Sequence, residues 1–489
     1  MTRMSDDGFF EWNSRIGIDT DDLGVYMLHW CLLAGFFPIL IVYGLALPLL
    51  WLSVKFHRPQ QSSSALCPRH QDSLGSQAAC NANGFDQFYR SLSEDCERNC
   101  LSFWRSCPPV VPHHLDGFST KEQAANLRAV VFWHYLHLWF GSLPGFRDLL
   151  RVKGFQVWSS VLRIPFCDVA VVLDFFDSMA LTTRTFVKSA ETVECSFNAA
   201  SVLGAVRLLW FCCALQCFAG QRIGPDRALT AYCLIYPLTD NYLDDPDMSR
   251  EKKKRFNKQL EAWIRKGTDN ADSPEDRTEA LVCTMLDAMA EAWPRGPYPQ
   301  VHYSLNAIHT AQTLSVDQTG GSQCSESFLE QVSAMKGGAS LVAAGCLVKG
   351  ELSPEDLQWL QYLGLGFQLL DDLQDLRSDH EEGRCTLFTL RVQEGGTMDG
   401  RIGQLLQYIA HPQALGLCSP DSGDLSDYLK VAIARLTTFL VLEAAAQLQE
   451  FLSPECRRVL EEVSPVALNR LKDFRFESRL YDIVCAAKL

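Results

Sequence analysis

Apolar residues recur at intervals of three and four along most of the chain after residue 119, a spacing typical of amphipathic helices. The segments with this spacing are 121–141, 155–183, 197–218, 226–244, 251–265, 276–292, 326–348, 354–377, 398–410, 425–451 and 454–475. At Ser353-Pro354 and Ser453-Pro454, a capping serine precedes a proline in the first turn, which is typical of a helix start. We find no series of alternating strand patterns in the sequence. The pattern therefore predicts an all-α protein built as a large helical bundle.

The N-terminal part has a different character. Residues 1–24 form an acidic tail, and residues 25–54 then contain no Asp, Glu, Lys or Arg. About 20 apolar residues suffice to cross a bilayer as a helix, so 25–54 is predicted to be a transmembrane helix. Pro38 and Pro48 leave a buried or re-entrant hairpin as the alternative. Basic residues at 55–58 follow at once, which predicts a single-pass membrane protein whose C-terminal part faces the cytosol.

Residues 55–115 are rich in Ser, Gln, Pro, Asn and Cys and show little helical periodicity. We expect them to be a linker or loose segment before the main helical domain, residues 116–489. The 19 cysteines of the chain are scattered and odd in number, which favours reduced thiols over a disulfide framework. The net charge of −14 argues against a nucleic-acid partner, because such proteins present a basic face.

A first cluster of acidic residues follows an apolar run. Asp240 and Asp244 are four residues apart, so on a helix their carboxylates would stack one turn above the other. Asp245 adjoins them, and Pro246 favours a bend or an end of the helix at this point. Like charges at this spacing destabilise a helix unless a cation neutralises them. Mg²⁺ prefers such oxygen ligands, commonly one or two carboxylates completed by substrate phosphates. A solvated acidic helix end is the alternative.

A second cluster repeats the spacing. Asp371 and Asp375 form another pair four residues apart, with Asp372 beside them. Apolar neighbours, among them Phe367 and Leu370, predict a buried helix whose carboxylates project into an interior cavity. If the two clusters face each other, they could hold several Mg²⁺ ions around one diphosphate.

The residues from Gly364 to Asp375 match the pattern G-x-x-F-Q-x-x-D-D-x-x-D at every fixed position. The segment thereby resembles the second acidic motif of trans-prenyltransferases, which are class I isoprenoid synthases. Lys336, in the string MKGGAS, looks like the Lys of that family's Lys-Thr-Gly helix, which contacts the diphosphate. The segment Gly383-Arg384-Cys385-Thr386 resembles the family's Gly-Lys-x-Thr, with Arg in place of Lys, and Gln318 lies about where the family carries a Gln. The resemblance implies an all-helical, Mg²⁺-dependent enzyme that ionises a prenyl diphosphate.

Several departures from the family pattern bear on the reaction. The first cluster reads D-x-x-x-D-D, like that of squalene and phytoene synthases, and the paired arginines that follow the prenyltransferase motif are absent. The Gly-Gly-Lys…Arg segment that binds isopentenyl diphosphate is not visible, and neither is the N-D-x-x-S-x-x-x-E triad of terpene cyclases. We therefore expect a terpene synthase that acts on one prenyl diphosphate. Elongation with isopentenyl diphosphate, squalene-type coupling and a membrane-anchored accessory subunit without activity are the alternatives.

The spacing and the resemblance together assign roles to individual residues. The predicted metal ligands are Asp240, Asp244, Asp245, Asp371, Asp372 and Asp375. The predicted catalytic residues are Lys336 and Arg384, which would clamp the diphosphate, and Gln368. The predicted substrate contacts are Tyr236, Phe367 and Arg250. The expected partners are a prenyl diphosphate and the membrane, and the sequence leaves a homodimer open.

Overall fold

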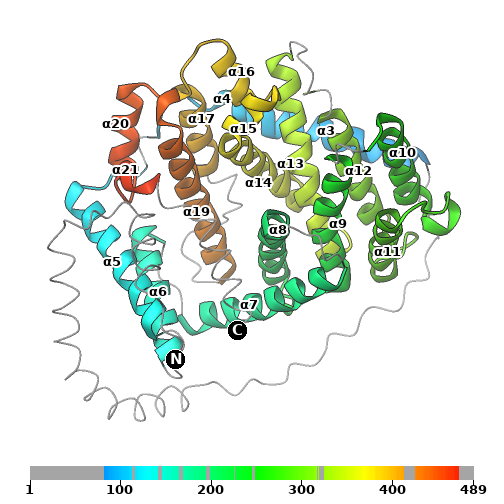
Figure 1. Cartoon of the computed structure of the whole chain (residues 1–489), viewed down its shortest axis with the longest axis horizontal. Coiled ribbons are helices and arrows are strands. Elements are labelled where there is room, and N and C mark those ends of the chain that lie inside the picture. The colour runs from blue at the N-terminus through cyan, green and yellow to red at the C-terminus, as the bar shows by residue number, and fades with distance from the viewer. Residues whose placement is uncertain are drawn as a thin grey trace.

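The structure is a computed structural model of the whole chain. It describes residues 82–112, 115, 117–140, 146–164, 169–193, 199–224, 226–244, 248–315, 318, 324–411 and 425–472. Within these ranges every regular element is a helix (Figure 1). The prediction of an all-α bundle is therefore confirmed. The acidic tail and the predicted transmembrane helix lie outside the described residues.

Residues 82–106, which we expected to belong to a loose segment, form three helices. They are α3 (Ala82–Asp95), the π-helix η1 (Cys96–Leu101) and α4 (Ser102–Ser106). Trp104 is fully buried, and its indole N–H donates to Oε1 of Glu330 at 3.2 Å. Arg105 pairs with the other oxygen of the same carboxylate at 2.7 Å. Contacts more than 200 residues away in the sequence hold these short helices to the core, which local periodicity does not reveal.

The next four helices are α5 (Thr120–Phe140), α6 (Phe146–Val161), α7 (Val169–Val193) and α8 (Ala199–Phe218). Figure 1 shows α5 and α6 as a hairpin at one edge of the molecule, with α7 running from it along the base of the bundle. The continuous helix expected over 155–183 is interrupted after Val161. There Arg163 adopts a φ of +50°, and the backbone N–H of Ile164 donates to Ser159 O at 2.8 Å, which closes the α6 helix end.

The middle of the chain forms α9 (Arg227–Asp244), α10 (Arg250–Lys266), the 3₁₀ turn η2 (Thr268–Asn270), α11 (Arg277–Ala292) and α12 (Pro299–Ser315). The remaining elements are α13 (Glu326–Lys349), α14 (Pro354–Gln374), α15 (Leu376–Glu382), α16 (Leu387–Gln393), α17 (Asp399–Ala410), α19 (Leu425–Gln447), η4 (Gln449–Phe451), α20 (Pro454–Val463) and α21 (Leu468–Leu471). The helix starts predicted at Ser353 and Ser453 are confirmed, since each serine accepts a hydrogen bond from the backbone three residues on.

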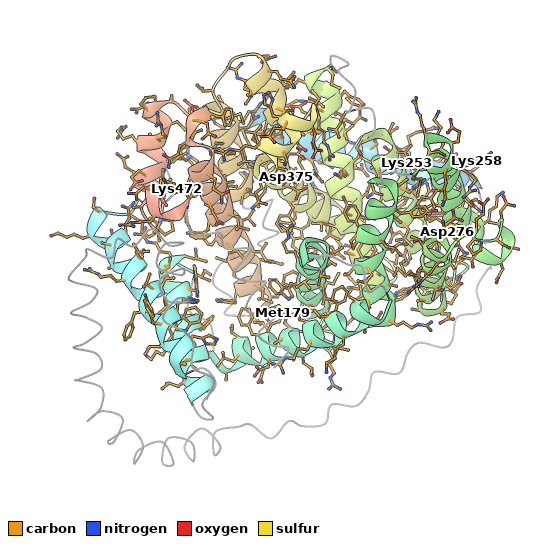
Figure 2. All side chains as sticks on the ribbon, in the orientation of Figure 1. Met179, Lys253, Lys258, Asp276, Asp375 and Lys472 are labelled. Atoms are coloured by element: carbon orange, nitrogen blue, oxygen red, sulfur yellow. The ribbon has the colours of Figure 1, made fainter. Side chains whose placement is uncertain are left out.

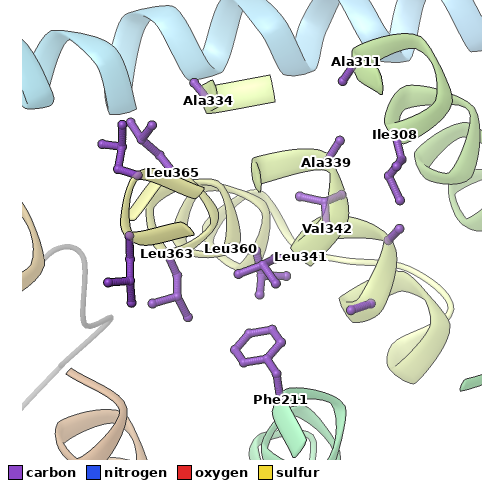
Figure 3. Close-up of a cluster of buried hydrophobic side chains, with 14 of the residues drawn as sticks. Phe211, Ile308, Ala311, Ala334, Ala339, Leu341, Val342, Leu360, Leu363 and Leu365 are labelled. Atoms are coloured by element: carbon purple, nitrogen blue, oxygen red, sulfur yellow. The ribbon is translucent and has the colours of Figure 1, made fainter. Parts of the chain in front are cut away.

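Helices α13 and α14 form the centre of the bundle, with α8 and α9 beside them (Figure 1). Their buried side chains include Leu341, Val342 and Leu365, and Figure 3 shows Phe211 of α8 pointing toward this cluster. Within the described residues, α13 is the one helix long and apolar enough to span a membrane. Because 83% of that stretch is buried inside the protein, its apolar character is that of a core helix.

Candidate functional site: the acidic cluster of α13, α14 and α15

A close crossing of α13 and α14 determines the geometry of the site. A Cβ atom added to Gly337 would lie 2.1 Å from the carbonyl oxygen of Gly364, and one added to Gly364 would lie 2.4 Å from that of Gly337. The two backbones are therefore in direct contact, which glycine alone allows. Ser333 contacts Asp372 on one side of the crossing, and Gly345 contacts Leu360 on the other, so the helices run antiparallel. The crossing brings Lys336 beside the second acidic cluster.

Asp372 is the buried member of this cluster. Gln368 donates from Nε2 to its Oδ1 at 2.9 Å, and Ser333 donates from Oγ to its Oδ2 at 3.0 Å. Burial raises the pKa of Asp372 to about 7, although the Gln368 hydrogen bond and the charge of Lys336 act in the opposite direction. Both carboxylate oxygens of Asp372 already have protein partners, so this side chain is held in one orientation.

Asp371 and Asp375 are more accessible than Asp372. Asp371 is half-buried, and Asp375 is exposed just beyond the last residue of α14 (Figure 2). The backbone N–H of Asp375 still donates to Asp371 O at 2.9 Å, so the two residues remain one helical turn apart. This one-turn separation is compatible with the predicted stacking of the Asp371 and Asp375 carboxylates. Both residues are more exposed to solvent than Asp372, and Oδ2 of Asp371 accepts from Nε2 of Gln368 at 3.5 Å.

Asp379 lies one further turn along, in α15, and joins the cluster. Burial raises the pKa of Asp379, and the positive charges of Arg384 and Lys336 counteract this effect. The charge of Lys336 thus acts on Asp372 in α14 and on Asp379 in α15. The half-buried Lys336 therefore lies near carboxylates of both α14 and α15.

Arg384 reaches the same cluster from the segment after α15. Gly383 ends that helix with a φ of +71°, which turns the chain back toward Asp379. The Nε atom of Arg384 lies 3.5 Å from Oδ1 of Asp379, yet it is buried and makes no hydrogen bond within the described residues. Such an unsatisfied donor beside Lys336 fits the binding of an anion.

Gln318 fixes the backbone of this segment. It accepts from Cys385 N at 2.9 Å through its carbonyl and donates from its side-chain Nε2 to Cys385 O at 3.0 Å. Thr386 caps α16, and Thr389 Oγ1 donates to Arg384 O at 2.9 Å. The segment predicted to bind diphosphate is thus held from both sides.

Two of the predicted substrate contacts, Phe367 and Tyr236, are in different surroundings. Phe367 is half-buried, and its ring meets that of Phe211 edge-on with centroids 5.8 Å apart. Tyr236 of α9 is 38% exposed. One turn before it, Tyr232 is buried and donates from its hydroxyl to Ser340 O of α13 at 2.7 Å. This contact places α9 against the same part of α13 that carries Lys336.

The first acidic cluster lies at the end of α9. Asp240 and Asp244 belong to its last turns, and their side chains are outside the description, as is the whole of Asp245. Tyr242, between them, donates from its hydroxyl to Asp276, the N-cap of α11. The predicted meeting of the two acidic clusters stays a prediction.

Two basic residues of α10, which follows the first cluster, are paired with α11. Lys252 lies 2.9 Å from Asp276, and Arg255 lies 2.9 Å from the fully buried Glu279. Arg250 is exposed in the first turn of α10. Figure 2 shows Asp276 and Lys253 on one side of the molecule and Asp375 nearer its centre. The described contacts thus link Lys252 and Arg255 to the α10–α11 junction and not to the acidic cluster.

A Mg²⁺ site fits the donors of the second cluster. The described residues contain no group of three or more His, Cys, Asp or Glu side chains placed to hold a metal ion. Mg²⁺ does not require one, because it is usually bound through one or two carboxylates together with phosphates. Asp371 and Asp375 supply two accessible carboxylates. Asp372 fits the role of ligand less well, because both of its oxygens have protein partners.

Ser333 and Asp379 complete the site, and the predicted site residues included neither. Ser333 holds Asp372 from a position 39 residues away. Its signal in the sequence is its place three residues before Lys336, which puts both on one side of α13. Asp379 stands out in the sequence as the next acidic residue one turn after Asp375, but the sequence assigned it no role.

Comparison with curated proteins finds distant relatives of this chain. The chain is 27% identical over 206 residues to the phytoene synthases of Mycobacterium bovis and Mycobacterium tuberculosis, which covers 40% of this chain and 63% of each of theirs. The chain is a member of the class I isoprenoid synthase superfamily. The chain spans less than two thirds of the length of these curated relatives.

Two further comparisons add less. A geranylgeranyl pyrophosphate synthetase from the archaeon Geoglobus acetivorans superposes with a TM-score of 0.28 and 16% identity, over 62% of this chain and 94% of that one. No family model matches the chain.

Proposed function

We propose that this isoprenoid synthase uses Mg²⁺ to ionise a prenyl diphosphate at the acidic cluster of α13, α14 and α15, and that it releases diphosphate and a terpenoid. One observation carries the proposal. Lys336 and Arg384 both act on the carboxyl of Asp379, which also feels the charge of Asp371, and the buried Nε of Arg384 makes no hydrogen bond within the described residues. A free anion with several oxygens, such as a diphosphate, would satisfy these donors.

The described residues can perform distinct parts of the reaction. Lys336 and Arg384 would bind the diphosphate and stabilise the negative charge that it gains as it leaves. Gln368 and Ser333 hold Asp372, so the site is organised before the substrate arrives. Phe367 and Phe211 pack edge-on against each other and would offer apolar rings that shield a carbocation from water. Bound Mg²⁺, held by Asp371 and Asp375 together with the aspartates of α9, would act as a Lewis acid on the leaving group.

Coupling of two prenyl diphosphates is a second candidate reaction. It is favoured by the 27% identity to phytoene synthases and by the D-x-x-x-D-D pattern of the first acidic cluster. Elongation with isopentenyl diphosphate is less favoured, because the sequence lacks the segment expected to bind that molecule. The membrane anchor at 25–54 also stays a proposal, and it would suit a lipophilic product.

The test is an assay of the full chain with geranyl, farnesyl and geranylgeranyl diphosphates, each with and without isopentenyl diphosphate and Mg²⁺. Diphosphate release and the extracted hydrocarbons are measured together. A product from one allylic substrate supports the terpene synthase, a product of twice its carbon number supports coupling, and a requirement for isopentenyl diphosphate supports elongation. No release from any substrate, with no rise in Tm on adding Mg²⁺ and a bisphosphonate, would favour the accessory subunit.

The variant Asp371→Asn tests the site itself. We expect diphosphate release to fall by about a thousandfold or more, because one of the two accessible carboxylates is lost, while the helical circular dichroism signal is retained. Glu355→Gln is the matched control, since it removes an exposed carboxylate at the other end of the same helix. Undiminished turnover by Asp371→Asn would contradict the assignment.

A further inference from the structure

Tyr242 links the last turn of α9 to both α10 and α11. Its hydroxyl donates to Oδ2 of Asp276, the N-cap of α11, and lies 3.3 Å from Oε1 of Glu279. Its ring packs against the fully buried Phe256 of α10, with centroids 4.7 Å apart. The proposed reaction gives this tyrosine no role, so its contacts need another explanation.

The two carboxylates that the hydroxyl contacts are themselves fixed. Asp276 accepts from the backbone N–H of Glu279 at 3.0 Å and from Nζ of Lys252 at 2.9 Å. Glu279 is fully buried and accepts from Nη2 of Arg255 at 2.9 Å and from the backbone N–H of Glu275 at 2.7 Å. Two cations thus balance two carboxylates, and the hydroxyl is held by a rigid, charge-balanced set of partners.

Tyr242 lies midway in the sequence between Asp240 and Asp244. Each residue of a helix turns the chain by about 100°, so positions two apart lie about 200° around the axis. On α9 the positions of the two aspartates therefore share one face, and Tyr242 occupies the opposite one. Its contacts with α11 fix the rotation of this turn and hence the direction of the face that carries the aspartates.

The last turn of α9 needs such a support. Asp244 is the final residue of the helix, and helix ends fray. Like charges four residues apart, as at Asp240 and Asp244, disfavour the helical conformation further. A tertiary contact from the opposite face offsets both effects.

We propose that Tyr242 is a positioning residue for the divalent-cation site of the first acidic cluster. This inference rests on the proposed function, which assigns Asp240 and Asp244 to Mg²⁺. The hydroxyl of Tyr242 touches neither metal nor substrate. It keeps the last turn helical and correctly rotated, so that the cation binds without first ordering this turn.

The test is a titration of the full chain with Mn²⁺, as a substitute for Mg²⁺, in the presence of inorganic diphosphate. Electron paramagnetic resonance measures the free Mn²⁺, so the readout does not depend on turnover. Tyr242→Phe removes the hydroxyl and keeps the ring against Phe256. We expect the Mn²⁺ affinity to fall about tenfold, because groups that orient metal ligands typically change metal affinity by about 10–100-fold when removed. Unchanged affinity would overturn the proposal.

Tyr408→Phe is the matched control. Tyr408 of α17 is fully buried, and its hydroxyl donates to Tyr362 O of α14 at 2.9 Å. Each variant leaves one acceptor without its donor, so both should lower Tm by about 2–4 °C. Only Tyr242→Phe should weaken Mn²⁺ binding. An equal loss of affinity in the two variants would reveal a general effect of reduced stability and would overturn the positioning role.

A second variant shows whether Tyr242 acts through the aspartates. In a chain that carries Asp240→Asn and Asp244→Asn, Tyr242→Phe should change the remaining Mn²⁺ affinity by less than about twofold, because a positioning residue has no effect without the ligands that it positions. A further tenfold loss in that background would contradict the proposal.

The outcomes separate this inference from the proposed function. A parent chain that binds Mn²⁺ more tightly than Tyr242→Phe, but releases no diphosphate from any prenyl substrate, supports the positioning role and contradicts the proposed function. Release of diphosphate by the parent, with equal Mn²⁺ affinity in the parent and Tyr242→Phe, supports the proposed function and overturns the positioning role. A parent that binds no Mn²⁺ in the presence of diphosphate would overturn both.

Discussion

The two acidic clusters have the same spacing in the sequence but different structural support. The second begins in a helix that starts with a capping box at Ser353, crosses α13 at direct backbone contact, and carries a carboxylate fixed by Gln368 and Ser333. The first lies in the last turns of α9, a helix with Pro237 inside it. Its neighbour Tyr242 and the basic residues of α10 are engaged with Asp276 and Glu279 of α11.

This difference suggests a division of roles between the clusters. A carboxylate cluster that is organised without its ligand can bind a diphosphate with little rearrangement, which favours the second cluster as the main anion site. The first cluster sits at the end of α9, beside Tyr242, which is engaged with α11.

The largest expected effect is a difference in kcat/KM between variants of Lys336, near the second cluster, and of Arg250, after the first cluster. Lys336→Gln should lower kcat/KM for the prenyl diphosphate by about a hundredfold to a thousandfold, because Lys336 acts on carboxylates of both α14 and α15. Arg250→Gln should lower it by no more than about threefold, since Arg250 is exposed in the first turn of α10. Steady-state kinetics of diphosphate release measures both. Equal losses in the two variants would mean that both regions bind the leaving group.

The next effect concerns the helix crossing that supports the second cluster. Gly337→Ala should destabilise the protein by about 3 kcal/mol or more, because the new Cβ would lie 2.1 Å from the oxygen of Gly364, a backbone atom that no side-chain rotation can move. Urea unfolding measures the change.

The adjacent glycine is the matched control for this variant. A Cβ on Gly338 would meet atoms of Gln361 at 3.6–3.8 Å, which is ordinary contact. Gly338→Ala should therefore be neutral, or stabilising by up to about 1 kcal/mol through the higher helix propensity of alanine. Similar destabilisation by both variants would contradict the close crossing at Gly337.

The sequence anticipated the second cluster better than its surroundings. The pattern from Gly364 to Asp375 indicated a buried helix, which the structure confirms, because the alternation of acids and apolar residues is local information. The roles of its residues stay predictions. Ser333 was missed because a serine within a helix has no periodic signature and its partner is 39 residues away. The helices at 82–106 were missed for a similar reason, since contacts such as Trp104 with Glu330 determine their packing. The break after Val161 depends on one residue with positive φ.

The smallest expected effect is a pH-dependent change in stability at the junction of α9, α10 and α11, beside the first acidic cluster. Burial alone would raise the pKa of Asp276, but hydrogen bonds from Tyr242, the Glu279 backbone and Lys252 hold it below its ordinary value. A carboxylate whose folded pKa is lowered contributes stability above its unfolded pKa of about 3.9 and loses it as the pH falls through the folded pKa. Asp276→Asn keeps the N-cap, because asparagine caps helices as well as aspartate does. The variant should therefore be about 1 kcal/mol less stable than the parent at pH 7.

This difference should shrink toward zero as the pH falls below about 3.9, because Asp276 then becomes neutral in the parent as well. Urea unfolding at a series of pH values measures it, with Glu355→Gln as a control whose exposed carboxylate has no such set of partners to lose. A difference that stays constant between pH 7 and pH 3 would show that the charge of Asp276 does not hold the α9, α10 and α11 junction together. In that case the first cluster would owe its position to the apolar contacts of α9, such as the ring of Tyr242 against Phe256, whose centroids are 4.7 Å apart.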